Sequence, residues 1–264
     1  MKLSQLTDFL EAHSPLSYQE DYDNCGLLVG DPQQEITSVL VCLDVTEEVL
    51  QEAITTGANV VIAHHPLIFR GLKKLIGADY VERAIIRAIR HDIAIYAMHT
   101  NLDNTLIQGV NTRIAEQLSL EDIRPLRPSS DTGLSVPKGI GIIGRLSTPM
   151  AADYFLEYLK DKMNTRCIRY TAPIGSTIQI VAACGGSGSF LLADAMREGA
   201  DVFVSGDFKY HEFFDGPGNI MIADIGHFES EQFTIDLIVN IISAEFSNFA
   251  VRMTKVMSNP IKYF

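Results

Sequence analysis

Residues 38–65 read SVLVCLDVTEEVLQEAITTGANVVIAHH, and this stretch decides the fold class. Short apolar, β-branched runs at 38–43 and 59–63 are typical of buried strands. Between them, Thr46 predicts the start of a helix because its hydroxyl can cap the first turn, and Gly57 predicts the end of that helix. Strand, helix and strand in this order predict two parallel strands joined by a crossover helix.

The same alternation continues through most of the chain. The spacing of Val81, Ala84 and Ala88 predicts one apolar face on a helix over 80–91. Further expected elements are an N-terminal helix, a helix at 150–163, and strands at 93–98, 140–147, 166–171 and 177–182. We therefore predict an α/β fold with mainly parallel sheets flanked by helices.

The second half of the chain also repeats the first. Val39-Leu-Val-Cys42 matches Val181-Ala-Ala-Cys184, and Gly57 precedes a strand as Gly199 does, in both cases 142 positions apart. A later block matches in the same order at a spacing of 127 positions. These matches predict two similar α/β lobes related by an internal repeat; the alternative is that any two strand–helix–strand units share such features.

A segment without periodicity separates the two lobes. Residues 119–138 are mostly polar and contain three of the ten prolines, which is typical of a long connection. We expect a first lobe at 1–125, a connection at 126–138 and a second lobe at 139–264, with a C-terminal segment able to pack back on the first lobe.

The composition excludes several classes of protein. A hydrophobic content of 47% and a charged content of 20% fit a folded globular chain. The net charge of −12 argues against a nucleic-acid binder and against adhesion to anionic membranes. No apolar run approaches the ~20 residues of a membrane span. The four cysteines are widely spaced, which indicates neither a disulfide framework nor a zinc ribbon and fits a cytoplasmic protein.

Four of the seven histidines lie at or just beyond the ends of predicted strands, where α/β proteins bind ligands: His64, His65, His99 and His227. Adjacent side chains on a regular strand point to opposite faces, but at a strand end the neighbouring His64 and His65 can diverge towards two ions. Two of the histidines are followed four residues later by a carboxylate, His99 by Asp103 and His227 by Glu231. On a helix this spacing puts both groups on one face, as in known metal-binding pairs.

Five of these side chains form a candidate ligand set: His64, His65, Asp103, His227 and Glu231. Glu231 is preferred to Glu229 because it shares its helix face with apolar residues, and a buried carboxylate needs a cation. Five ligands exceed what one zinc needs, so they predict two ions about 3.5–4 Å apart. The nitrogen and oxygen donors fit zinc, iron, manganese or cobalt. Two such ions would lower the pKa of a shared water and yield hydroxide as a nucleophile.

Six motifs in this order extend over nearly the whole chain: Asp23-Asn24-Cys-Gly26, Ala63-His64-His65-Pro66, His99-Thr-Asn-Leu-Asp103, Ser205-Gly206-Asp207 with Tyr210-His211-Glu212, Gly226-His227-Phe-Glu-Ser-Glu231, and Ser258-Asn-Pro-Ile. In these motifs the chain resembles the dinuclear-metal-centre family of GTP cyclohydrolase I type 2 homologues, also called NGG-interacting-factor-like proteins. It resembles the short form of the family, without an inserted domain.

The resemblance implies the same five metal ligands, with Glu231 contacting both ions. It also implies a toroidal homohexamer built as a trimer of dimers. The implied reaction is hydrolytic opening of the guanine imidazole ring of GTP, with release of formate. We expect His99 to transfer protons in this reaction or, alternatively, to orient Asp103. Asp207 and His211 are expected near the same site.

Two functions therefore remain open. The first is a metal-dependent hydrolase acting on a nucleotide-like anion, whose phosphates would meet Arg70, Lys73 and Lys74 unless these form an ordinary solvated loop. The second is a non-catalytic metal-binding or regulatory protein that forms a hexameric ring. The acidity disfavours a ring around DNA. The glycine-rich stretch 184–188 either binds a phosphate through its amides or forms a tight turn from strand to helix.

Overall fold

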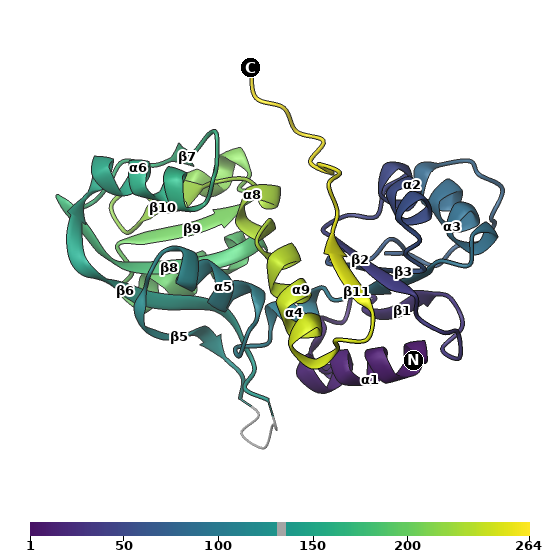
Figure 1. Ribbon diagram of the computed structural model, residues 1–264. Coiled ribbons are helices and arrows are strands. Elements are labelled where there is room, and N and C mark those ends of the chain that lie inside the picture. The colour runs from purple at the N-terminus through teal and green to yellow at the C-terminus, as the bar shows by residue number, and fades with distance from the viewer. Residues whose placement is uncertain (131–135) are drawn as a thin grey trace. The chain divides into compact units, whose positions relative to one another are not determined.

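The computed structural model describes residues 1–130 and 136–264, which fold into two compact units. Unit 1 comprises Met1–Leu102 and Thr234–Pro260, and unit 2 comprises Asp103–Phe233 and Ile261–Phe264. Each unit contains one β-sheet with helices packed against it (Figure 1). All four cysteines are free thiols. None of the described helices combines the length and apolar character that crossing a membrane requires.

The sheet of unit 1 has five strands in the order β1 (Gly26–Val29), β4 (Ala94–Ala97), β3 (Val60–Ala63), β2 (Ser38–Cys42) and β11 (Ala250–Met253). All neighbouring strands are parallel except β1, which runs antiparallel to β4. One face of the sheet packs against α2 (Glu47–Thr56) and α3 (Tyr80–Arg90). On the other side lie α1 (Leu3–His13) and α9 (Thr234–Glu245) (Figure 1).

The predicted strand–helix–strand unit at 38–65 is confirmed. The Thr46 hydroxyl accepts a hydrogen bond from the Val49 amide at 3.3 Å and so caps α2. Gly57 ends α2 with φ +73°, a left-handed conformation that glycine adopts without steric cost. Every residue of β2, β3 and β4 is buried, as expected for central parallel strands covered on both faces.

The sheet of unit 2 has six strands in the order β5 (Glu121–Pro128), β6 (Gly139–Ala151), β8 (Thr177–Ser187), β9 (Val202–Gly206), β10 (Met221–Asp224) and β7 (Arg169–Tyr170). Strands β8, β9 and β10 are parallel, and the other pairs are antiparallel. The expectation of a mainly parallel sheet therefore holds for unit 1, whereas this sheet is mixed.

Helices cover both faces of the second sheet as well. Its two hydrophobic clusters involve α5 (Val110–Gln117) and α6 (Ala152–Lys162) on one face and α7 (Leu192–Arg197) on the other. The remaining helical segments are α4 (Thr100–Asp103), α8 (His227–Glu231), and the 3₁₀ helices η1 (Leu16–Tyr18), η2 (Ser189–Leu191) and η3 (Tyr210–Asp215).

The two sheets confirm the internal repeat. In unit 1 the strands follow the order β1-β4-β3-β2, and in unit 2 the order β7-β10-β9-β8. In unit 1, β1 is antiparallel to β4, while β2, β3 and β4 are parallel to one another. In unit 2, β7 is antiparallel to β10 in the same way, while β8, β9 and β10 are parallel to one another. The spacings of 142 and 127 residues in the sequence thus relate strands with equivalent positions.

The segment expected as a connection is different. Residues 121–128 form β5, an edge strand that pairs with β6, although Pro125 and Pro128 suggested a loop. Proline is tolerated there because an edge strand needs hydrogen bonds on one side only. Residues 131–135 of the expected connection at 126–138 lie outside the described residues. The unit boundary falls at 102/103 rather than in that connection, because α5 packs on the second sheet.

Candidate metal centre

The functional side chains of unit 1 come from the carboxyl ends of three neighbouring parallel strands. Asp44 follows β2, His64 and His65 follow β3, and His99 follows β4. Because these ends lie on one edge of the sheet, the three imidazoles meet, and each offers a nitrogen within 4.8 Å of the others. The rings of His64 and His65 are 4.9 Å apart at their centroids. On a regular strand, neighbouring side chains would point to opposite faces of the sheet. His64 and His65 escape this rule because β3 ends at Ala63, just before them.

Each of these histidines has its Nδ1 bonded to an oxygen. His64 Nδ1 lies 2.7 Å from the Met98 carbonyl oxygen, and His65 Nδ1 lies 2.8 Å from Asp44 Oδ1. His99 Nδ1 lies 2.9 Å from Asp23 Oδ1. An oxygen acceptor at Nδ1 places the ring proton there, so in the neutral ring Nε2 carries the lone pair. This is the usual arrangement of metal-binding histidines.

Asp44 and Asp23 are themselves fixed by further hydrogen bonds. Ser258 Oγ donates to Asp44 Oδ2 at 2.7 Å, which explains the Ser258-Asn-Pro-Ile motif near the C-terminus. Asp23 is fully buried and accepts a hydrogen bond from the Thr100 amide at 3.0 Å. Burial alone would raise the pKa of both carboxyl groups, but hydrogen bonds from His65 to Asp44 and from His99 to Asp23 lower it. Both residues are therefore ionised partners of an imidazole at neutral pH.

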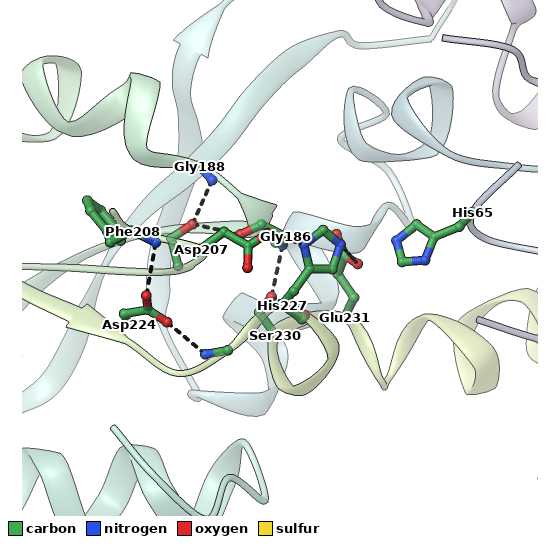
Figure 2. Close-up of polar contacts among 12 residues, drawn as sticks. His65, Gly186, Gly188, Asp207, Phe208, Asp224, His227, Ser230 and Glu231 are labelled. Carbon is green, nitrogen blue, oxygen red and sulfur yellow. Dashed lines mark hydrogen bonds and ion pairs between the residues drawn. The ribbon is translucent and has the colours of Figure 1, made fainter. Parts of the chain in front are cut away.

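Unit 2 contains a matching arrangement after its parallel strands (Figure 2). Asp207 directly follows β9, and His227 begins α8 just after β10. His227 Nδ1 lies 2.7 Å from Asp207 Oδ2, and His227 Nε2 lies 3.1 Å from Glu231 Oε2. Burial opposes a charge on this imidazole, but the hydrogen bonds to Asp207 and Glu231 outweigh it and raise the pKa of His227 to about 11. Without a metal, the two carboxylates therefore favour the protonated form of this imidazole.

Asp224 connects the two segments that carry Asp207 and His227. Its Oδ2 accepts a hydrogen bond from the Phe208 amide at 2.9 Å, and its Oδ1 accepts one from the Gly226 amide at 2.9 Å (Figure 2). Asp207 has φ +59°, a left-handed conformation that aspartate tolerates better than most residues. The carboxylate of Asp224 thus stabilises the turn that points Asp207 at His227.

The glycine-rich end of β8 makes room for Glu231. A Cβ atom at Gly186 would overlap the Glu231 carboxylate, and Gly186 has φ +61°. The Gly186 amide donates to Ser230 Oγ at 2.8 Å, and the Gly188 amide donates to Ser205 Oγ at 3.0 Å (Figure 2). Because these two amides bind side chains of the same unit, the interpretation of this stretch as a phosphate loop is not supported. Its glycines instead allow a carboxylate to approach the strand.

Asp103 and Glu231 face the same thiol. Burial raises the pKa of Cys184, and the negative charges of Asp103 and Glu231 raise it further. Glu231 is 2% exposed, so its carboxylate is nearly dry. The donors of unit 2 are therefore two carboxylates and one imidazole, a set that suits zinc, iron, manganese or cobalt. The donor chemistry of both units fits a divalent metal.

The entire sequence except its last four residues matches one protein family, described as Duf34/NIF3 (NGG1p interacting factor 3), over residues 1–260. The chain belongs to the NIF3 family. A Clostridium perfringens protein named GTP cyclohydrolase 1 type 2 homolog is 34% identical over 232 residues, covering 88% of this chain and 87% of that protein. A Campylobacter jejuni protein of the same name is 32% identical over 266 residues, covering both chains fully at 100%.

Solved structures agree with this NIF3 assignment. The crystal structure of the Staphylococcus aureus hypothetical protein SA1388 superposes with a TM-score of 0.91 at 32% identity, covering 100% of this chain and 99% of that one. A Bacillus cereus protein related to NIF3 has the same fold, with a TM-score of 0.89 at 24% identity and coverages of 100% and 99%.

In this NIF3 chain the residues expected near the site differ in their surroundings. The structure groups His99 with His64 and His65, so His99 is placed as well for metal binding as for proton transfer. His211 is exposed, with its ring 5.3 Å from that of Tyr210. Glu229 is 6% exposed, so burial does not distinguish it from Glu231; its side chain points towards Gly226 instead.

The residues that were missed are the oxygen acceptors Asp23, Asp44 and Asp224. Asp44 follows β2 just as His64 follows β3, so the strand-end rule could have found it. Asp23 lies in the Asp23-Asn24 motif, but its bond to His99 joins residues 76 positions apart. No local pattern in the sequence shows such a contact.

Proposed function

We propose that this protein is a dinuclear metal-dependent hydrolase of a nucleotide-like anionic substrate, with the GTP cyclohydrolase chemistry that its relatives' names suggest. The ligands would be two groups, His64 and His65 from unit 1, and Asp103, His227 and Glu231 from unit 2. Five donors exceed what one ion needs and suit two.

One observation carries this proposal. His64, His65 and His227 each have Nδ1 bonded to an oxygen, at 2.7, 2.8 and 2.7 Å, so that Nε2 is the nitrogen that would bind a metal. In His227 a metal would replace the ion pair of Nε2 with Glu231. An arrangement that served only to pack the core would need no such agreement among three rings. Glu231 adds a buried carboxylate, whose desolvation a cation would offset.

The residues of the chain would divide the chemistry among them. Two bound divalent ions would acidify a water molecule and polarise the substrate. Asp44 and Asp207 keep the rings of His65 and His227 in their orientation. His99, bonded to the ionised Asp23, would accept a proton at Nε2, and Asp23 would stabilise the resulting imidazolium. The product expected from GTP is formate together with the ring-opened nucleotide.

The test is a comparison of Glu231→Gln with Glu229→Gln in the protein purified with its metal. Both glutamates are buried in α8, so Glu229→Gln controls for the loss of a buried charge on that helix. We expect Glu231→Gln to lose metal and formate release from GTP, measured by elemental analysis and a formate assay. Glu229→Gln is expected to retain metal.

Absence of turnover by the metal-loaded protein across a panel of nucleotides would contradict the hydrolase. With metal still bound, that result would favour the alternative of a non-catalytic metal-binding or regulatory protein. The homohexamer implied by the family resemblance is part of both proposals, and analytical ultracentrifugation of the purified protein tests it separately.

A further inference from the structure

Unit 2 exposes a cluster of aromatic side chains on η3 and β7. Tyr210 and Phe214, on η3, are 71% and 64% exposed, and Tyr170, on β7, is 53% exposed. The rings of Tyr210 and Phe214 contact each other edge to face, with centroids 5.4 Å apart. Single exposed rings are common on protein surfaces, but a cluster of them indicates a binding surface.

These rings line a pocket of about 370 Å³, together with Phe213 and Arg169. This volume lies within the range of small-molecule sites. Four aromatic rings and one guanidinium group all offer flat surfaces. Such walls favour a flat ligand, because planar groups stack on aromatic rings and on guanidinium planes.

The charge of Arg169 is already balanced by a buried carboxylate, although the Arg169 side chain itself is 56% exposed. Its guanidinium pairs with Asp224, a side chain only 2% exposed, and donates to the Phe208 carbonyl at 3.0 Å. It also lies 5.3 Å from the centroid of the Phe213 ring. These contacts hold the guanidinium of Arg169 in place. Its positive charge is therefore already paired, and what it offers a ligand is mainly its planar surface. The pocket fits an uncharged planar ring better than a bare phosphate.

The pocket also adjoins the segments that carry Asp207 and His227. Asp224 pairs with Arg169 in the pocket wall and binds the amides of Phe208 and Gly226. Phe208 directly follows Asp207, and Gly226 directly precedes His227. Tyr210 follows Asp207 by three residues. The pocket wall and the segments that carry Asp207 and His227 are therefore held by the same buried carboxylate.

We propose that this pocket binds the nucleobase of the substrate, stacked on Tyr210 and Phe214. The inference rests on the proposed function for the class of substrate. It adds which side chains recognise the base and assigns that role to residues outside the metal ligand set.

The experiment measures binding by calorimetry, with the full-length protein as purified. The probes are guanosine 5′-monophosphate and ribose 5-phosphate, which share the sugar phosphate and differ in the base. We expect ribose 5-phosphate to bind at least about tenfold more weakly, because it lacks the stacking ring. Tyr210→Ala and Phe214→Ala should each weaken binding of the nucleotide by roughly tenfold. Tyr154→Ala, which removes a 67% exposed tyrosine from α6, is the control and should leave the affinity unchanged.

Equal affinities for the two probes, or unchanged affinity in both ring variants, would overturn the inference. It would also be overturned if Tyr210→Ala altered only the sedimentation coefficient, because the rings would then form a contact between copies of the chain. Binding and turnover separate this inference from the proposed function. A protein that binds the base through these rings but releases no formate would support the inference and contradict the hydrolase.

Discussion

Three of the proposed ligands, His64, His65 and His227, share one feature with His99: an oxygen bonded to Nδ1. The acceptors are a main-chain carbonyl for His64 and the carboxylates of Asp44, Asp207 and Asp23 for the others. Such acceptors fix the ring and its tautomer, and they make the opposite nitrogen a better ligand. The proposed ligands were chosen from their spacing along the sequence and their places at predicted strand ends. Asp44 has such a place too, after β2. Asp23 has none, because it meets His99 only through the fold.

Gly186→Ala is expected to remove metal without replacing any ligand. The added methyl group would overlap the Glu231 carboxylate, so Glu231 must move. Gly199→Ala is the matched control, because Gly199 also has a positive φ, +74°, but nothing lies within 4 Å of the added Cβ. Both variants carry the backbone cost of about 1 kcal/mol. Elemental analysis should show metal loss in Gly186→Ala only. Equal metal content in the two variants would contradict the role given to Gly186.

Metal affinity is expected to rise with pH. The pKa of His227 is raised to about 11 without a metal, so at neutral pH the ring is protonated, and a metal must displace that proton. If binding displaces one proton, the apparent affinity for the metal rises about tenfold for each unit by which the pH is raised, as long as the pH stays below that pKa. Competition with a chelator at pH 6, 7 and 8 measures the slope. Asp207→Asn removes one of the two carboxylates that raise the pKa of His227, so the slope should flatten only at the upper end of the range, if at all. An affinity of the wild-type protein that does not change with pH would contradict displacement of a proton from His227.

At the scale of elements, the sequence predicted the central strands and helices and missed β5. The runs that became β2, β3 and β4 are apolar throughout, because both faces of these strands are covered. Strand β5 has mostly exposed residues and two prolines, so it has neither alternation nor an apolar run. Its pairing with β6 and the ion pairs of its arginines stabilise it instead, and neither is visible in the local sequence.

Asp194 in α7 links that helix to β5. It is 5% exposed, and it binds Arg127 of β5 and Arg197 of its own helix. Burial opposes the charge, but the two arginines lower the pKa of Asp194 below its ordinary value of 3.8. The stabilisation is therefore complete above about pH 4 and is lost as the pH falls through the lower pKa of the folded state.

Asp194→Asn should reduce the free energy of unfolding at pH 7 by about 1–2 kcal/mol, because a charge-assisted hydrogen bond is lost. The difference from wild type should shrink in strong acid, where Asp194 is protonated in both states. Urea unfolding at pH 7 and at pH 2 measures both values. Asp161→Asn, an exposed substitution in α6, is the control. A difference that does not change with pH would contradict the ionic role of Asp194.

At the scale of the whole chain, the repeat was visible in the sequence, but the unit boundaries were not. The spacing of 142 residues relates β2 and β3 to β8 and β9 because both units place their parallel strands in the same order. The boundaries depend on where single segments pack. Residues Thr234–Pro260 belong to unit 1 because β11 pairs with β2, a contact across more than 200 residues. A C-terminal segment able to pack back on the first lobe was expected from the sequence, but its start at Thr234 and its pairing with β2 were not.

Removal of metal is expected to destabilise the whole chain. A ligand that binds only the folded state raises its stability, so a chelator should lower Tm of the wild-type protein by several degrees. Glu231→Gln should already have the lower Tm and should not respond to the chelator. Differential scanning calorimetry measures all four samples. An equal response of the variant and the wild type to the chelator would mean that the stabilising metal binds elsewhere.

The central proposal is that the candidate ligand set holds a pair of metal ions. Anomalous scattering from crystals of the protein as purified tests it most directly. The predicted result is two peaks about 3.5–4 Å apart, contacted by His64, His65, Asp103, His227 and Glu231. The absence of anomalous peaks, or a separate peak at the ligands of each unit, would contradict the account.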